Sequence, residues 1–188
     1  MSVRIRRART DELTPDELDA LHRLCRTAFA DPGATRDPAD LGFTAEDWAH
    51  ACGGVHAFAV EDGVPTAHGS VVERELHVAG VALHAGYVEA VATRSDHRGR
   101  GLGTAVMRAL GVEIRARFEL GALDTSLHGF YARLGWEPWR GPTFVRTDDG
   151  LVATTEEDGY VMILRTPSTP RIDLDAPISC EWRPGDVW

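Results

Sequence analysis

Hydrophobic positions along the chain change their spacing, and each change marks a different predicted element. Residues 87–93, Tyr-Val-Glu-Ala-Val-Ala-Thr, carry apolar side chains in both phases of a two-residue repeat, which predicts a strand buried on both faces. From Leu102 the apolar residues recur at helical spacing, through Val106, Leu110 and Ile114, with Val112 beside them. A polar, glycine-rich turn separates the two segments. The central unit is therefore a strand, a turn and a helix.

Shorter patterns predict the elements around this unit. Val3–Arg6 alternates as a strand does, and Thr14-Pro15-Asp16-Glu17 combines an N-cap threonine, a first-turn proline and a capping-box glutamate. Thr44 caps a second short helix that runs to Ala51. The other predicted elements are strands at 55–61, from 64 to about 76, at 120–123, 135–139 and 160–164, and a short helix at 127–134. Residues 31–42 are predicted to be a loop, either inert or part of a substrate rim, and the chain from Thr166 is predicted to be irregular.

Composition narrows the class of protein. The 188 residues, 43% of them hydrophobic, suit one compact domain over 1–188, with 165–188 as an irregular tail. A net charge of −9 argues against a nucleic-acid partner and mildly favours a cationic one. No apolar run reaches membrane-spanning length, and the first residues resemble no signal peptide, so we expect a cytoplasmic protein with no membrane partner.

Cysteine and histidine usage argues against a disulfide framework and against a metal. The three cysteines, Cys25, Cys52 and Cys180, are widely spread and are read as buried thiols in a reducing compartment. The eight histidines show no ligand spacing, so we predict no metal site.

The turn Arg98-Gly99-Arg100-Gly101-Leu102-Gly103 has the properties of a phosphate cradle. Glycines let the backbone approach an anion closely, the start of a helix presents N–H groups, and arginines add charge-assisted contacts. The Gly-Lys-Ser/Thr of a nucleotide-hydrolase loop is absent, and the glycines are too close together for a dinucleotide fingerprint. A solvated glycine–arginine turn is the alternative.

This turn, directly after a valine-rich strand, resembles the acyl-CoA pyrophosphate loop of the GCN5-related N-acetyltransferases (GNAT). The resemblance implies an α/β (α+β) fold in which a mixed, mostly antiparallel sheet is flanked by helices and splayed where acetyl-CoA enters. It also implies acetyl-CoA as the cofactor, with CoA as product. The implied cofactor-binding residues are Val91, Ala92, Thr93, Arg98, Gly99, Arg100, Gly101, Leu102, Gly103 and Thr104.

Three positions could carry acetyl transfer. The amine must lose a proton, the oxyanion needs a hydrogen-bond donor, and the thiolate needs a proton. Glu89, in the central strand, could take the amine's proton, unless it is only ion-paired at a sheet edge. The backbone N–H near Val91 is the candidate oxyanion donor. Tyr131, in a segment similar to the family's Phe-Tyr-x-x-x-Gly-Phe, is implied as the general acid, with simple packing as the alternative.

Four further segments resemble the aminoglycoside 2′-N-acetyltransferases. They are 52–57, 86–91, 135–141 and the tail 180–188, Cys-Glu-Trp-Arg-Pro-Gly-Asp-Val-Trp. In that family the last tryptophan and its free carboxylate help to hold a polycationic amino sugar. The implied substrate-binding residues are Asp40, Asp47, Glu89, Ala90, Asp124, Glu157, Asp186 and Trp188. Within the tail, Trp182 is the tryptophan that we expect to serve packing.

The resemblance implies direct acetyl transfer to the 2′-amine of an aminoglycoside, with antibiotic resistance as the result, and a homodimer. Three features depart from the family pattern: a longer 31–42 loop, a segment between Leu123 and Tyr131 that is about two residues shorter, and Asp124 where a serine is usual. All three lie at the acceptor side, so an atypical aminoglycoside such as kasugamycin stays open. So do another cationic amine (a polyamine, a peptide N-terminus or a cell-wall amino sugar) and a non-catalytic acyl-CoA sensor.

Overall fold

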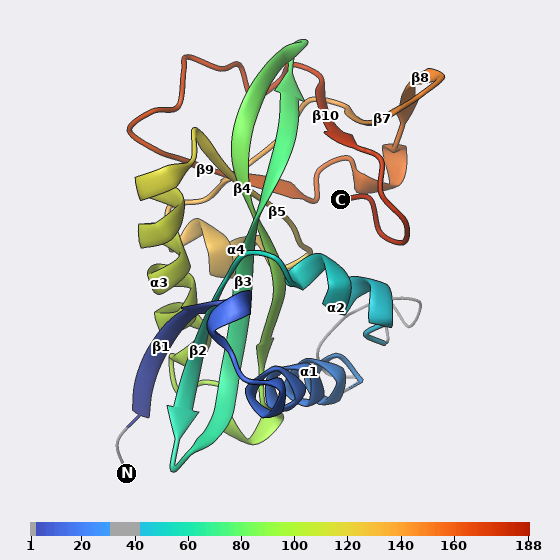
Figure 1. Cartoon of the computed structure of the whole chain (residues 1–188). Helices are drawn as coiled ribbons and strands as arrows, with labels where there is room; N and C mark the ends of the chain where they lie inside the picture. Colours follow the sequence, from blue (N-terminus) through green and yellow to red (C-terminus); the bar gives the residue numbers. More distant parts are fainter. Residues whose placement is uncertain (1–2, 31–41) are drawn as a thin grey trace. The chain divides into compact units, whose positions relative to one another are not determined.

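The computed structural model describes residues 3–30 and 42–188, drawn in Figure 1. They form two compact units, each built from two stretches of chain. The first unit is Met1–Val72 with Val88–Leu110, and the second is Glu73–Tyr87 with Gly111–Trp188. Strands β3 (Val64–Val78) and β4 (Val81–Thr93) and helix α3 (Leu102–Arg117) each contribute residues to both. The single domain expected from composition stays a prediction.

The first unit is an antiparallel sheet with helices packed on it. Its remaining elements are β1 (Val3–Arg9), η1 (Thr10–Glu12), α1 (Pro15–Phe29), α2 (Ala45–Ala51), β2 (Val55–Glu61) and η3 (Ser95–His97). Strand β1 pairs with β2, and β2 pairs with the first half of β3 across a turn at Asp62 and Gly63. The register of β2 and β3 shifts by one residue between Ala59 and Val60.

Opposite faces of this sheet carry different helices. Leu21 of α1 packs with Phe58 of β2, and Trp48 of α2 packs against the same cluster. Figure 1 shows α1 and α2 next to each other. Gly69 faces the other way, since a Cβ placed there would lie 3.1 Å from Leu110 and 3.3 Å from Val106 of α3. The predicted stripe of α3 is confirmed at these positions.

Both predicted helix starts are confirmed. Thr14 accepts the Glu17 N–H, and the Glu17 carboxylate accepts the Thr14 N–H in return, which closes the predicted capping box of α1. Thr44 and Asp47 form the same reciprocal pair at α2, at 3.1 and 2.7 Å. These helices begin where local side-chain chemistry satisfies their first N–H groups.

The second unit is a mixed sheet that includes the second half of β3 and the first half of β4. Its other elements are β5 (Leu120–Asp124), α4 (His128–Ala132), β6 (Glu137–Pro138), β7 (Thr143–Thr147), β8 (Gly150–Ala153), η4 (Thr155–Glu157), β9 (Val161–Arg165) and β10 (Ile178–Glu181). The strand order is β6-β9-β5-β4-β3-β10-β7-β8. Strands β4 and β5 pair in parallel, as do β10 and β7, and β5 with β9 is antiparallel. The predicted mixed sheet flanked by helices is confirmed.

Four expectations are corrected by the structure. The tail is not irregular throughout, because Ile178–Glu181 forms β10 between β3 and β7. Strands β7 and β8, on either side of a turn at Asp148 and Asp149, were not predicted from the sequence. The predicted helix at 127–134 and strand at 135–139 are shorter than expected. Val112 is 59% exposed and does not belong to the buried stripe of α3.

Two further expectations concern the 31–42 loop and membrane-spanning segments. The predicted loop at 31–42 lies outside the described residues, except for Gly42, and so does Asp40. Among the described residues, no helix is long and apolar enough to cross a membrane.

Candidate active site

The central strand β4 contains a backbone irregularity at the predicted catalytic segment. Ala90 has a φ of 52°, in the left-handed region that a residue with a Cβ rarely adopts. Its carbonyl accepts a hydrogen bond from Nδ1 of His68 at 2.9 Å, inside the unit. All peptide bonds described are trans, so the Val91 N–H points to the opposite side of the peptide from that carbonyl. Glu89, directly before this peptide, is half-buried, and its carbonyl accepts from Ser70 Oγ at 3.5 Å.

The predicted phosphate loop leads from η3 into α3. Gly99 and Gly101 have φ values of 76° and 78°, where residues with side chains are strained, and a Cβ at either would meet no atom within 4 Å. The Ala105 N–H donates to the Gly101 carbonyl at 3.0 Å, which is the first bond of the helix. The N–H groups of residues 102–104 precede that bond, at the positive end of the helix dipole. The loop therefore has the backbone form of an anion cradle.

Arg100 lies in an ion-pair network that the sequence did not reveal. Its guanidinium donates to both carboxylate oxygens of Glu61, at 3.0 and 2.7 Å. Nε2 of His97 lies 2.9 Å from the same carboxylate, and its Nδ1 lies 2.7 Å from Asp96, which also accepts two bonds from Arg94. The Arg100 hydrogen bonds, with smaller help from His97, lower the pKa of the Glu61 carboxyl. Arg100 thus fixes the loop to β2 in this structure.

The other predicted cofactor residues surround the same loop. Arg98 is exposed and donates to the carbonyl of Ala28 at 3.4 Å. The Ala92 side chain is buried against Cys25 and Ala28 of α1, so Ala92 can offer a ligand only its backbone. Thr93 closes β4.

In the second unit the structure brings together Asp124 and Tyr131. Burial raises the pKa of the Tyr131 hydroxyl, and the negative charge of Asp124 raises it further. Tyr131 packs edge-on against Phe130 and Trp136, with ring centroids 4.9 and 6.1 Å away. A tyrosine in this environment carries its proton at neutral pH.

The tail residues form a second group in that unit. The Trp188 indole N–H donates to Thr154 Oγ1 at 3.0 Å, and the Thr154 carbonyl accepts from the Glu157 N–H at 2.9 Å. Arg183 donates to the backbone carbonyl of Asp186 at 2.7 Å and to the terminal oxygen of Trp188 at 3.2 Å. The C-terminus therefore docks on the segment that carries Glu157.

The two tail tryptophans have degrees of burial opposite to those expected. Trp188 is only 3% exposed and packs, whereas Trp182 is 59% exposed. The reason is the indole bond to Thr154, which turns the Trp188 ring inward. The Trp188 ring is therefore buried, and Arg183 binds the terminal oxygen of the same residue.

The remaining predictions concern Asp47 and the cysteines. Asp47 was predicted at the substrate rim, and one of its carboxylate oxygens accepts the Thr44 N–H at the N-cap of α2. Burial raises the pKa of all three thiols, that of Cys180 to about 11, so none is a thiolate at neutral pH. No group of three potential metal ligands occurs within the part of the chain described here.

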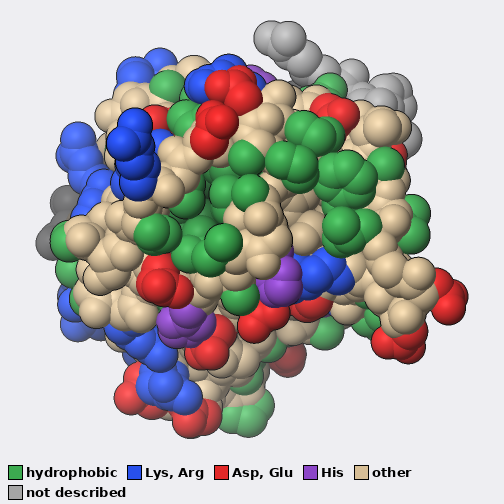
Figure 2. Space-filling view, turned by 90° about the horizontal axis from the view of Figure 1, so that it is seen from above, with side chains coloured by type: hydrophobic (Ala, Val, Ile, Leu, Met, Phe, Trp, Pro, Cys, Tyr) green, Lys and Arg blue, Asp and Glu red, His purple; other side chains and the backbone are tan. Residues whose placement is uncertain are grey.

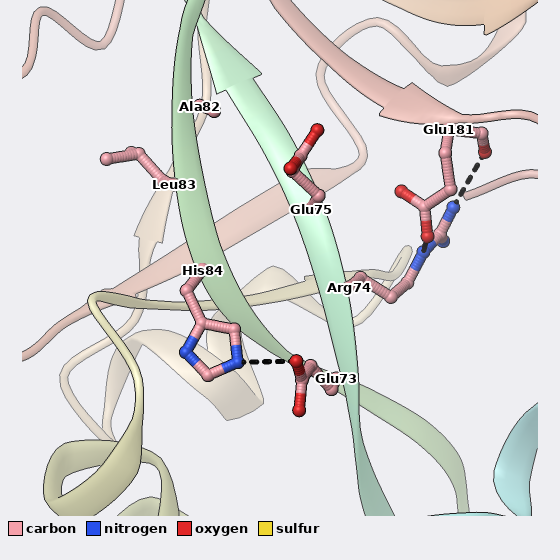
Figure 3. A pocket seen from close by; sticks show the side chains of 7 residues that line it. All are labelled: Glu73, Arg74, Glu75, Ala82, Leu83, His84 and Glu181. Atoms are coloured by element: carbon pink, nitrogen blue, oxygen red, sulfur yellow. Dashed lines mark hydrogen bonds and ion pairs between the residues drawn. The ribbon is translucent and has the colours of Figure 1, made fainter.

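An open hollow of about 340 Å³ lies elsewhere in the second unit, on the β3–β4 hairpin beside β10 (Figure 3). Glu73 reaches across it to His84, and Glu181 binds Arg74. None of its lining residues was predicted to be catalytic. Carboxylates also lie at several separate places on the face seen in Figure 2, so acidity alone does not locate an acceptor site.

Comparison with known proteins settles the family. Residues 9–139 match the family described as "Acetyltransferase (GNAT) domain". An aminoglycoside 2′-N-acetyltransferase of Mycolicibacterium fortuitum is 46% identical over 150 residues, which cover 78% of this chain and 77% of that protein. The chain belongs to the aminoglycoside 2′-N-acetyltransferase family of GNAT enzymes. It is an acyltransferase with acetyl-CoA as its acetyl donor. The glycine turn at 99–101 and the start of α3 at residues 102–104 have a form that fits an anion such as the donor's diphosphate.

Solved structures agree on the fold. A GNAT acetyltransferase of Brucella melitensis, in complex with acetyl-CoA, has a TM-score of 0.59 and is 19% identical, with 92% of this chain and 94% of that chain covered. A GCN5-related N-acetyltransferase of Kribbella flavida has a TM-score of 0.56 and is 20% identical over 75% of this chain. The match spans 35% of that longer chain.

Sequence reasoning missed several residues that shape these groups. Glu61 and His97 hold the loop, Thr154 and Arg183 hold the tail, and His68 holds Ala90. The motif 52–57 contained one signal, His56, whose structural partner was not predictable from spacing along the chain.

Proposed function

We propose that this enzyme transfers the acetyl group of acetyl-CoA directly to the 2′-amine of an aminoglycoside. The observation that carries the proposal is the 46% identity with an enzyme named for that acceptor, over most of both chains. Modification of this amine would confer resistance to the antibiotic.

Three groups of the chain would perform the chemistry. The Glu89 carboxylate takes the proton that the attacking amine loses, directly or through a water. The Val91 N–H donates to the thioester oxygen, where negative charge develops during attack. Tyr131 gives its proton to the departing thiolate, and its raised pKa supports this role because the hydroxyl keeps its proton until then. Ala90 has a left-handed backbone conformation, and its carbonyl is bonded to His68, so the Val91 N–H points to the other side of this peptide. This orientation supports the role of Val91.

Binding of the donor would use the loop in two ways. The N–H groups of residues 102–104 and the backbone at Gly99 and Gly101 receive the diphosphate, and Arg98 adds a positive charge. Arg100 acts mainly through Glu61, by holding the loop in place. The backbone groups of Val91, Ala92 and Thr93 bind the remainder of the donor.

Binding of the acceptor would depend on carboxylates, since an aminoglycoside carries several ammonium groups. The proposed set is Asp47, Glu89, Asp124, Glu157, Asp186 and the terminal carboxylate of Trp188, with Asp40 from outside the described residues. Ala90 would contribute only its N–H, because its carbonyl is bonded to His68. An atypical acceptor such as kasugamycin is within this proposal.

Transfer would occur in one ternary complex, without an acetylated enzyme. The raised pKa values of Cys25, Cys52 and Cys180 support this, because a thiol must be a thiolate to act as nucleophile. We also propose that the enzyme works in the cytoplasm as a homodimer, which light scattering of the purified protein would test.

Release of free thiol from acetyl-CoA, measured with a panel of aminoglycosides that includes kasugamycin, tests the proposal. We expect thiol release that depends on the aminoglycoside, together with a product heavier by one acetyl group. Release with polyamines or peptide N-termini alone would replace the aminoglycoside by another cationic amine. Binding of CoA with no release for any amine would instead indicate a sensor.

A further inference from the structure

A buried pair of histidines lies on the carbonyl side of the Ala90–Val91 peptide of β4. His56 of β2 and His68 of β3 are fully buried, and His56 Nδ1 lies 2.9 Å from His68 Nε2. His68 Nδ1 lies 2.9 Å from the Ala90 carbonyl. At the other end, His56 Nε2 lies 2.9 Å from the Thr10 hydroxyl. The four groups form one continuous chain of hydrogen bonds within the first unit.

The chemistry of these groups fixes the direction of the bond to Ala90 and of the bond between the two rings. A carbonyl only accepts, so Nδ1 of His68 carries the proton and its Nε2 accepts from Nδ1–H of His56. His56 Nε2 is then an acceptor that faces the Thr10 hydroxyl. That hydroxyl also lies 3.2 Å from the Gly54 carbonyl, and its oxygen accepts the Gly53 N–H at 2.9 Å. Both rings are neutral at neutral pH, because burial lowers the pKa of His56 to about 4 and that of His68 to about 3.

Side chains of α1 and α2 pack against the pair. Trp48 of α2 lies with its ring centroid 5.9 Å from each imidazole, and Cys25 of α1 has its Sγ 3.5 Å from His68 Nδ1. Gly54, beside Thr10, cannot be replaced, since a Cβ there would lie 1.9 Å from the Val71 carbonyl oxygen. Gly53 and Gly54 both bind the Thr10 hydroxyl, through the Gly53 N–H and the Gly54 carbonyl, at the outer end of the chain of bonds.

We infer that His56 and His68 are positioning residues for acetyl transfer: they hold the Ala90–Val91 peptide so that the Val91 N–H faces the thioester oxygen. Ala90 occupies a left-handed conformation that is unfavourable for a residue with a Cβ, so it needs an external bond to keep it. The Ala90 carbonyl receives a short bond from His68 Nδ1, at 2.9 Å, and a longer one from Cys25 Sγ, at 3.8 Å. His68 is therefore its main donor, and His56 fixes the tautomer of His68. The inference rests on the proposed role of Val91.

Binding of acetyl-CoA and of CoA, compared by calorimetry, tests this without any acceptor. Only acetyl-CoA carries the oxygen that would accept from Val91, so wild type should bind acetyl-CoA more tightly than CoA. His68→Leu should bring the ratio of the two Kd values close to one while the Kd for CoA stays unchanged. His68→Asn places an N–H near the position of Nδ1 and should keep the wild-type ratio. Phe58→Leu, a control opposite His68 in the β2–β3 register, should change neither value.

Two outcomes would overturn the inference: equal affinities in wild type, or a wild-type ratio in His68→Leu. In turnover, His68→Leu should lower kcat by about ten- to a hundredfold, no more than the direct loss of an oxyanion donor would. His68→Asn should restore most of the lost kcat. If no aminoglycoside is acetylated, the proposed acceptor fails, but the ratio of affinities still decides the role of the histidines.

A measurement on wild type covers the case in which His68→Leu does not fold. Nitrogen NMR of the imidazoles at neutral pH should show both rings neutral, with the proton on Nδ1 of each. A charged His68, or a proton on its Nε2, would contradict the bond to Ala90 and with it the inference.

Discussion

Arg100 binds Glu61 through two hydrogen bonds, at 3.0 and 2.7 Å, although the sequence places this arginine in the phosphate loop. The pair links the loop to the end of β2, and His97 joins the same carboxylate. The two arginines of the loop therefore have different tasks. Arg98 is the one that we expect to contact a phosphate directly.

Single substitutions should separate these tasks. We expect Arg98→Ala to weaken CoA binding about three- to tenfold, since an exposed charge-assisted bond contributes modestly. Arg100→Ala should weaken binding indirectly, through a looser loop. If Arg100 acts through Glu61, the double variant Arg100→Ala with Glu61→Gln should be no worse than either single variant. Additive losses in a calorimetric double-mutant cycle would show that Arg100 contacts the ligand itself.

Tyr131→Phe should lower kcat about a hundredfold and leave the Kd for acetyl-CoA unchanged, because a general acid acts in the reaction and not in donor binding. The ring stays, so its packing on Phe130 and Trp136 is preserved. Steady-state kinetics together with calorimetry would check this. An unchanged kcat would remove Tyr131 from the mechanism, and a large change in Kd would make it a binding residue.

The tail tryptophans provide a matched pair. Trp188→Phe removes the bond to Thr154 and should cost about 1 kcal/mol of docking free energy, which we expect to appear as a higher KM for the acceptor. Trp182→Phe should change little, because that ring is exposed. Equal effects of the two substitutions on the acceptor KM would contradict the docking described here.

The histidine pair also predicts how stability depends on pH. Both pKa values lie below the ordinary value of about 6.5, so the unfolded chain takes up protons below that pH that the folded chain excludes. The free energy of unfolding is therefore unaffected by the pair above pH 6.5 and falls from there toward about pH 4. The slope is up to about 1.4 kcal/mol per pH unit for each histidine.

Urea unfolding between pH 7.5 and 4.5 would measure this slope. We expect His68→Leu to have a shallower slope than wild type, and Phe58→Leu to keep the wild-type slope at a lower stability. A wild-type slope in His68→Leu would mean that His68 is charged in the folded protein.

Features determined by neighbouring residues were predictable from the sequence, and features determined by distant pairing were not. The capping boxes at Thr14 and Thr44 and the glycine turn before α3 depend on local chemistry, and all three appear where expected. Strand β10 has only four residues, and its stability depends on β3 and β7, which are distant in the chain. The pattern of four residues does not show which distant strands they pair with.

The histidine pair was hidden for a similar reason. A regular two-residue turn at Asp62-Gly63 would place His68 opposite Ala57, on the other face of the sheet from His56. The shift between Ala59 and Val60 moves His68 opposite Phe58 and so onto the face of His56. A bulge of this kind leaves no clear signal in the pattern of hydrophobic residues.

The measurement that tests the central claim most directly uses two aminoglycosides that differ only at the 2′ position, one with an amine and one with a hydroxyl. Each is incubated with acetyl-CoA and the enzyme, and the product is located by NMR. The account predicts thiol release with the amine only, and an acetyl group on its 2′ nitrogen. Acetylation of both compounds, or at another nitrogen, would contradict it.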